Sequence, residues 1–170
     1  PRGGYLTGPA ARTRVHAARQ QSDAVLVGSG TVAADDPQLD VRLVAADPDR
    51  RPRPVILASS ADVAATARSV RHGTIVIVAP DAPALRCAAL VAAGAEVVAV
   101  ARDRATDGID IRAALAALLD RRILTVFAEP GPRLARSMLG AGVVDVVELH
   151  VAGGTRMTRP PQPALSELAF

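Results

Sequence analysis

Residues that could take part in chemistry are concentrated between Gly28 and Arg42. This stretch begins with Gly28-Ser29-Gly30-Thr31-Val32-Ala33, which fits the G-x-G-x-x-A pattern of dinucleotide-binding domains. In those domains the pattern opens a long helix, and here Pro37 stands too close behind it to allow one, so a standard Rossmann mode is disfavoured. The pattern still indicates a glycine-rich strand end, where the Thr31 hydroxyl and free N–H groups can bind phosphate oxygens.

Two adjacent carboxylates, Asp35 and Asp36, come directly before Pro37. Taken alone, such a pair indicates an Asx-type turn as readily as an active site. In the functional interpretation, one carboxylate faces a cleft and handles protons or hydroxyl groups, while Arg42 binds an anion bidentately. Both interpretations stay open on these residues alone.

A basic stripe is expected on a helix near the start of the chain. Arg12, His16 and Arg19 follow one another at spacings of four and three, which places them on one helix face. Such a stripe is usually solvated, but it could equally hold a phosphate.

A further candidate is the turn that begins Glu129-Pro130-Gly131-Pro132. An apolar run ends in an acid there, and the tight turn opens a helix whose first N–H groups and positive dipole end suit a phosphate. In open α/β sheets, ligands collect outside the carboxyl ends of the strands. Glu129 and the segment after Gly28 both lie at such ends, which favours a functional site.

The elements that must position these residues alternate along the chain. Several of the expected strands are continuous Val/Ile/Leu runs, as in strands buried on both faces of a parallel sheet. They are Ala24–Val27, Pro54–Ala58, Thr74–Ala79, Glu96–Val100, Ile123–Ala128 and Val144–Val151. The expected helices are Pro9–Gln21, Pro83–Ala93, Ile111–Arg121 and Pro132–Ala141. We therefore predict an α/β domain over residues 1–154, with a mostly parallel central sheet flanked by helices, and a Pro-rich tail over 155–170.

Composition excludes several classes of protein. All 20 basic residues are arginine, the net charge is only +3, and the arginines are spread along the chain, which argues against nucleic-acid binding. The single cysteine, Cys87, excludes an internal disulfide, and no apolar run reaches the ~20 residues of a membrane span. His72 and His150 have no partners at metal-ligand spacing, so no metal site is expected. With no signal peptide expected either, we predict a cytoplasmic protein.

From Asp23 to Arg42 the chain resembles, without a gap, the C-terminal reductase domain of the bifunctional riboflavin-biosynthesis deaminase/reductase. The family pattern there is Asp-Ala-Ile-Leu-Val-Gly-x-Gly-Thr-Val-Leu-Ala-Asp-Asp-Pro-x-Leu-x-Val-Arg. A second similarity is the family's Glu-Gly-Gly-Pro-x-Leu, here Glu129 to Leu134. The resemblance implies a dihydrofolate-reductase-like fold and the NADPH-dependent reduction of 5-amino-6-(5-phosphoribosylamino)uracil to its ribitylamino product. It also implies a homodimer and a fused or separate zinc deaminase.

The resemblance also implies roles for individual residues. Its NADP contacts fall on Tyr5, Thr31, Asp35 and the turn formed by Gly131, Pro132, Arg133, Leu134, Ala135, Arg136 and Ser137. Its substrate contacts fall on Gly3, Arg19, Leu39, Arg42 and Glu129. Hydride would pass to C1′ of the ribose, and we expect Asp35 to be the catalytic group that organises proton transfer or holds the ribose in reactive geometry.

Three departures from the family pattern bear on these expectations. The family's first strand, with its Ser-x-Asp-Gly, would precede Gly3, and further strands would follow Val151, so we expect the sheet to lack its first and last strands. Pro130 replaces a small residue and offers no N–H to a phosphate. Two alternatives stay open: a truncated or degenerate homologue that binds nucleotide without catalysis, and a related pterin or dihydrofolate-type reductase.

Overall fold

Five short strands of mainly β-branched and aliphatic residues form one parallel sheet in the computed structural model, which describes residues 8–45, 47 and 50–150. The strands are β1 (Ala24–Gly28), β2 (Arg53–Leu57), β3 (Ile75–Val78), β4 (Glu96–Ala99) and β5 (Val126–Ala128). They lie in the order β4-β3-β2-β1-β5, and every neighbouring pair is parallel. The predicted parallel α/β sheet is confirmed.

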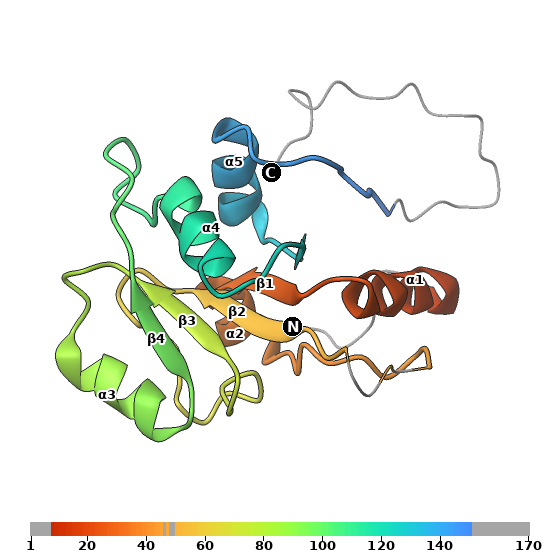
Figure 1. The fold of residues 1–170 in the computed structure, drawn as a ribbon, viewed down its shortest axis with the longest axis horizontal. Coiled ribbons are helices and arrows are strands. Elements are labelled where there is room, and N and C mark those ends of the chain that lie inside the picture. Colours follow the sequence, from red (N-terminus) through yellow and green to blue (C-terminus); the bar gives the residue numbers. More distant parts are fainter. Residues whose placement is uncertain (1–7, 46, 48–49, 151–170) are drawn as a thin grey trace.

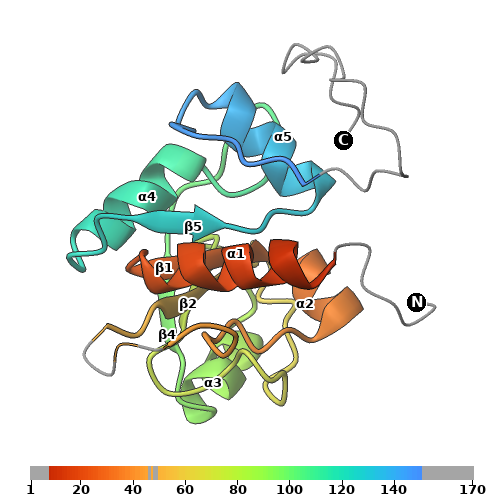
Figure 2. The same cartoon turned by 90° about the vertical axis from the view of Figure 1, so that its right-hand side faces the viewer.

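Helices cover both faces of this sheet. They are α1 (Pro9–Gln20), α2 (Ser29–Asp35), α3 (Ala84–Ala92), α4 (Ile111–Leu119) and α5 (Pro132–Gly140). Helices α4 and α5 lie on one face, and α2 and α3 lie on the other (Figure 1). Figure 2 shows α1 in front of β1, outside these two layers. None of the described helices is long and apolar enough to cross a membrane.

Because successive strand residues point to opposite faces, the sheet builds two cores. On one face, strand residues such as Leu26 pack with Leu118 of α4 and Met138 of α5. On the other, Val27 packs in the same cluster as Val32 of α2 and Leu90 of α3. The second cluster also holds Leu39, which the loop after α2 inserts into the core.

The four predicted helices are confirmed to within two residues at each end, and a fifth was missed. Asp110 caps α4 by accepting hydrogen bonds from the N–H groups of Arg112 and Ala113. The missed helix is α2: Pro37 excludes the long helix of a Rossmann domain, but seven residues still form a helix before it. Asp36 ends α2 in the left-handed conformation, with φ of 40°.

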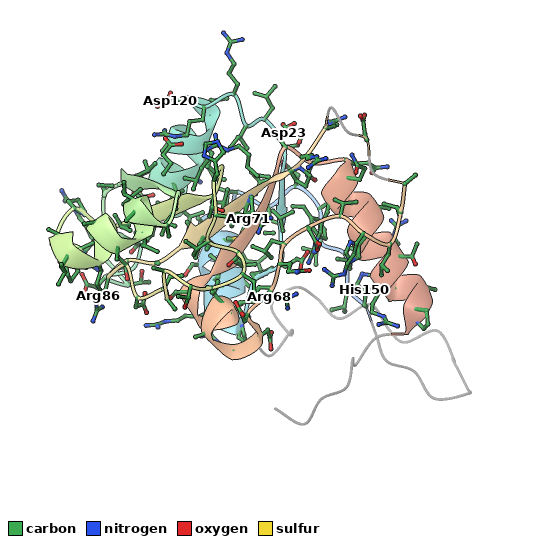
Figure 3. The ribbon with its side chains drawn as sticks, turned by 90° about the horizontal axis from the view of Figure 1, so that it is seen from below. Asp23, Arg68, Arg71, Arg86, Asp120 and His150 are labelled. Atoms are coloured by element: carbon green, nitrogen blue, oxygen red, sulfur yellow. The ribbon has the colours of Figure 1, made fainter. Side chains whose placement is uncertain are left out.

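The predicted last strand is wrong over the described residues 144–150, and Val151 lies outside them. This segment belongs to no strand, and Val146 and Leu149 are 82% and 55% exposed. Its main chain is not paired with any strand of the described sheet, and an apolar run without such pairing does not make a strand. It is tied to α1 by an ion pair between Arg14 and Glu148, beside which His150 lies (Figure 3). The predicted tail over 155–170 lies outside the described residues.

Candidate active site where β1 and β5 end

A nearly buried ion pair joins helix α1 to the end of β5. The Arg19 Nε atom lies 2.6 Å from Glu129 Oε1, and its Nη2 atom lies 2.8 Å from Glu129 Oε2. Arg19 is only 7% exposed. Glu129 follows β5 directly, and its N–H donates to the carbonyl of Leu26 in β1, so the sheet fixes this end of the pair. Two of the predicted substrate residues, 110 positions apart in the chain, are thereby brought together.

The same helix face holds the loop after α2. Arg19 Nη1 donates to the Asp40 carbonyl at 2.8 Å, and the main-chain N–H of Arg42 donates to His16 Nδ1 at 3.2 Å. The Arg42 guanidinium forms an ion pair with the Asp40 carboxylate, and its side chain stays 47% exposed. The basic stripe that sequence spacing places on α1 is therefore a packed contact surface at His16 and Arg19, although such stripes are usually solvated.

The surroundings of His16 favour its neutral form. Burial lowers the pKa of His16 by desolvating the charged form, and the positive charges of Arg19 and Arg42 lower that pKa further. The carboxylates of Asp40 and Glu129 act in the opposite direction, more weakly. A neutral imidazole is what the geometry requires, because Nδ1 accepts a hydrogen bond and so carries no proton.

Two predicted cofactor residues meet beside this cluster. A Cβ atom added at Gly131 would lie 3.6 Å from the Thr31 hydroxyl, and one added at Gly28 would lie 3.8 Å from Leu134. Gly131 is the N-cap of α5, and no side chain caps that helix end. Pro132 occupies the first turn, so the N–H groups available to an anion begin at Arg133. The bare helix start beside the Thr31 hydroxyl fits the pyrophosphate of a dinucleotide.

The two adjacent carboxylates have different surroundings. Asp36 Oδ1 accepts a hydrogen bond from the N–H of Arg68 at 2.8 Å, and Figure 3 shows Arg68 near α2. Asp35 is the last residue of α2 and is exposed, and its carboxylate forms no hydrogen bond or ion pair with the other described residues. Asp36 is therefore used in a structural contact with a segment 32 residues away and not in a local Asx-type turn, and the Asp35 carboxylate remains available to a ligand.

The other predicted site residues differ in how far they are exposed to a ligand. The Leu39 side chain is 1% exposed, and Ala135 is 7% exposed, so only their main chains can face a ligand. Arg133 and Arg136 are exposed on α5, and the Ser137 hydroxyl donates to the Arg133 carbonyl. Gly3 and Tyr5 lie outside the described residues.

Sequence reasoning missed two members of the cluster. His16 was noticed only as part of the basic stripe, and Asp40 was not singled out at all. Their partners lie 26 and 21 residues away, in Arg42 and Arg19 respectively. Helical spacing identified the correct face of α1, but no local pattern shows which loop packs against it.

A basic cavity of about 710 Å³ lies on the other side of this loop, at the amino ends of β2 and β3. Its lining includes five arginines, namely Arg50, Arg51, Arg53, Arg68 and Arg71. Of the predicted site residues, Leu39 lines this cavity, whereas Thr31, Glu129 and Gly131 do not. The cavity is therefore not the place where the candidate cofactor residues meet. Among the residues that the structure describes, no three potential metal ligands come together.

Comparison with known proteins gives a consistent set of relatives. The sequence model of the RibD C-terminal domain matches residues 2–156. The chain is 36% identical over 141 residues to the 2,5-diamino-6-ribosylamino-4(3H)-pyrimidinone 5′-phosphate reductase of Methanothermobacter thermautotrophicus, covering 82% of this chain and 63% of that protein. It is 32% identical over 158 residues to the riboflavin biosynthesis protein RibD of Bacillus amyloliquefaciens, covering 89% of this chain and 41% of that protein. The chain thus spans less than two thirds of either relative.

Solved structures show the same fold. Acinetobacter baumannii RibD superimposes with a TM-score of 0.66 at 27% identity, over 85% of this chain and 38% of that one. The riboflavin biosynthesis reductase Rib7 of Saccharomyces cerevisiae superimposes with a TM-score of 0.58 at 23% identity, over 78% of this chain and 58% of that one. At that lower identity, the second likeness concerns the fold alone.

Proposed function

The chain belongs to the RibD C-terminal domain family and has its dihydrofolate-reductase-like fold, and from this premise we propose that it is an NADPH-dependent reductase. Its proposed substrate is 5-amino-6-(5-phosphoribosylamino)uracil, and its product is the corresponding ribitylamino compound of riboflavin biosynthesis. The observation that carries the proposal is the Arg19–Glu129 pair. It lies with Asp40 and Arg42 in one cluster, at the strand ends where Thr31 and Gly131 also meet.

The geometry supports a division of the site into two sides. On the cofactor side, the Thr31 hydroxyl and the bare start of α5 would hold the anionic groups of NADPH, which supplies the hydride. On the substrate side, Arg42 is the cation best placed to bind a phosphate, because its side chain is 47% exposed and its partner Asp40 sits at the surface. Glu129 has oxygens to accept hydrogen bonds from ribose hydroxyl groups.

Asp35 is the residue we propose to serve the proton transfer. Reduction adds hydride at C1′ and breaks the bond from C1′ to the ring oxygen, and that oxygen must take up one proton. An exposed carboxylate at the end of α2, with no partner among the described residues, can hold the ribose or organise the path of that proton. Its neighbour Asp36 is occupied in holding Arg68.

A second substrate is favoured by a specific observation. The archaeal relative, at 36% identity, is named as a reductase of the 2,5-diamino pyrimidinone, which carries an amino group where the uracil carries an oxygen. Both compounds bear the same ribose phosphate, so the contacts described above suit either. The pyrimidine ring is where the two candidates differ.

The proposal is tested by following loss of NADPH absorbance with each of the two ribosylamino pyrimidine phosphates. We expect turnover with one of them and a product two hydrogens heavier. NADPH binding without turnover of either compound would instead support a homologue that binds nucleotide without catalysis. Reduction of dihydrofolate alone would support the pterin-type alternative, and no NADPH binding would overturn the proposal.

Three further properties are proposed because the family implies them. They are a homodimer, a cytoplasmic location and a zinc deaminase that supplies the uracil substrate. Light scattering tests the first, and fractionation of cells tests the second. For the third, adding a purified deaminase should permit turnover of the diamino compound by a protein that alone accepts only the uracil.

A further inference from the structure

His16 is a buried residue that the proposed reaction does not use, although it contacts the proposed site. It lies on α1, is 5% exposed, and accepts a hydrogen bond at its Nδ1 atom from the main-chain N–H of Arg42. The ring must therefore carry its proton on Nε2. A buried imidazole that accepts from a main chain 26 residues away is a specific contact and not general packing.

The loop that His16 contacts, residues 36–42, must be stabilised by contacts with other segments of the chain. Between Asp36 and Arg42 two non-glycine residues, Asp36 and Leu39, have φ angles of 40° and 51°. The left-handed conformation costs about 1 kcal/mol for such residues, so tertiary contacts must stabilise it. The contacts that do so run from Arg68 to Asp36, from Arg71 to the Gln38 carbonyl, from Arg19 to the Asp40 carbonyl and from Arg42 to His16.

His16 provides the last of these contacts, to Arg42, whose guanidinium faces the solvent. We propose that neutral His16 is a positioning residue, which fixes the main chain of Arg42 so that its guanidinium is presented to the phosphate of the substrate. This inference rests on the proposed function, because it assigns a purpose to the position of Arg42. His16 itself touches neither substrate nor cofactor in this account.

Protonation of His16 would break its hydrogen bond with the main-chain N–H of Arg42. A protonated Nδ1 is a donor, and it would face the N–H of Arg42, which is also a donor. The new positive charge would lie beside Arg19 on the same helix and Arg42 in the loop, with the carboxylates of Asp40 and Glu129 also facing it. Substrate binding should therefore weaken as pH falls through the pKa of His16, which burial sets below the ordinary histidine value.

Two variants separate the hydrogen bond from the volume of the side chain. His16→Asn offers an amide oxygen at the position of Nδ1, and His16→Leu fills a similar volume without an acceptor. We expect His16→Leu to raise the KM for the ribosyl phosphate about tenfold, as loss of one buried hydrogen bond would. Its kcat and its KM for NADPH should change less than about twofold, and His16→Asn should recover most of the loss.

The pH profile supplies a readout that a structural role would not move. In wild type, KM should rise on acidification by more than ionisation of the substrate phosphate explains. In His16→Asn, only the part due to the substrate should remain, because asparagine does not titrate. Identical acid limbs in the two proteins would overturn the inference.

A double-mutant cycle with Arg42→Ala asks whether His16 acts through Arg42. If it does, His16→Leu should cost about tenfold in kcat/KM in wild type and almost nothing when Arg42 is already alanine. Equal losses in both backgrounds would contradict the inference.

A measurement that needs no turnover keeps this inference separate from the proposed function. In nitrogen NMR of the whole chain, the His16 Nδ1 resonance should be that of an unprotonated nitrogen, and the Arg42 amide should exchange faster in His16→Leu. Those results together with an inactive wild type would overturn the reductase proposal, but the hydrogen bond between His16 and the Arg42 main chain would still be supported. An active wild type in which the Arg42 amide exchanges at the same rate in His16→Leu would support the reductase proposal and overturn the inference about His16.

Discussion

Arg19 and Glu129 face each other through two parallel hydrogen bonds of 2.6 and 2.8 Å, which join helix α1 to the carboxyl end of β5. A third bond from Arg19 reaches the Asp40 carbonyl, so one guanidinium connects three segments of the chain. Because its guanidinium is used in these contacts, Arg19 has a framework role, which is to hold the three segments of the site together. The more exposed Arg42 is then the group that a ligand can engage.

Removing the carboxylate of this pair should destabilise the fold. Glu129→Ala leaves the guanidinium of Arg19 nearly buried and uncompensated, so we expect the free energy of unfolding to fall by about 2–3 kcal/mol in urea denaturation. The matched control is Asp81→Ala, which removes a similar two-point contact with Arg102 at the surface. That variant should unfold at nearly the urea concentration of wild type, and equal effects of the two substitutions would contradict the framework role.

Filling the space between Gly131 and Thr31 should block the cofactor without harming the fold. Gly131 has φ of −70°, and a methyl group there would lie 3.6 Å from the Thr31 hydroxyl, an ordinary contact. Gly131→Ala should therefore fold normally and bind NADPH at least about tenfold more weakly by calorimetry, because the methyl occupies the approach to the start of α5. In the control Gly140→Ala, where nothing lies within 4 Å, binding should be unchanged.

Replacing the two adjacent carboxylates, Asp35 and Asp36, should have different effects on turnover. Asp35→Asn should lower kcat at least about tenfold while NADPH binding persists, because the group proposed to organise the proton is lost. Asp36→Asn keeps an oxygen for the Arg68 N–H and tolerates the left-handed conformation, so turnover should stay near that of wild type. Unchanged turnover in Asp35→Asn would remove Asp35 from the mechanism.

Acid stability should depend on Asp23, which lies where β1 and β5 begin (Figure 3). The N–H of Thr125 lowers the pKa of Asp23 most, and the Thr125 hydroxyl and the N–H of Leu124 lower that pKa further. Because the folded-state pKa is below the unfolded one, the stabilisation is present above the ordinary aspartate pKa and is lost as pH falls through the folded value. Unfolding followed from neutral to acid pH should show a smaller loss of stability in Asp23→Asn than in wild type. A loss as large in the variant would exclude Asp23 as a source of the acid sensitivity.

Two glycines allow backbone strain to be separated from crowding. Gly94 and Gly73 have φ of 93° and 88°, but a Cβ at Gly94 would lie 3.1 Å from the His72 nitrogen and one at Gly73 would meet nothing within 4 Å. Gly73→Ala should cost about 1 kcal/mol of unfolding free energy, the cost of its conformation alone. Gly94→Ala should cost more, by about another 1 kcal/mol, since His72 must also move. Equal losses would show that the contact with His72 relaxes freely.

Local patterns were sufficient for most of the fold. Apolar runs located the five parallel strands, and the four predicted helices lie within two residues of the observed ones. The pattern failed at residues 144–150, whose apolar residues have no strand to pair with in the described sheet. It also failed at α2, where excluding a long helix did not exclude one of seven residues.

The candidate site was predictable in part. Of the carried-over positions, Arg19 on α1 pairs with Glu129, and Gly131 lies beside Thr31. The second contact follows from the sheet, because Thr31 and Gly131 come after the ends of the neighbouring strands β1 and β5. The role of His16 was not predictable, since it depends on how the loop packs on α1. Nor could the sequence show that the Leu39 side chain is buried and turned into the core.

The central claim is hydride transfer to C1′ of a ribosylamino pyrimidine phosphate, and isotope transfer tests it most directly. The chain would be incubated with NADPH carrying deuterium at the reactive face of its nicotinamide, in each face-labelled form, and the pyrimidine product examined by NMR. The account predicts one deuterium at C1′ of a ribityl chain, from one of the two labelled forms only. Product without deuterium from either form, or no ribityl product from either pyrimidine, would contradict it.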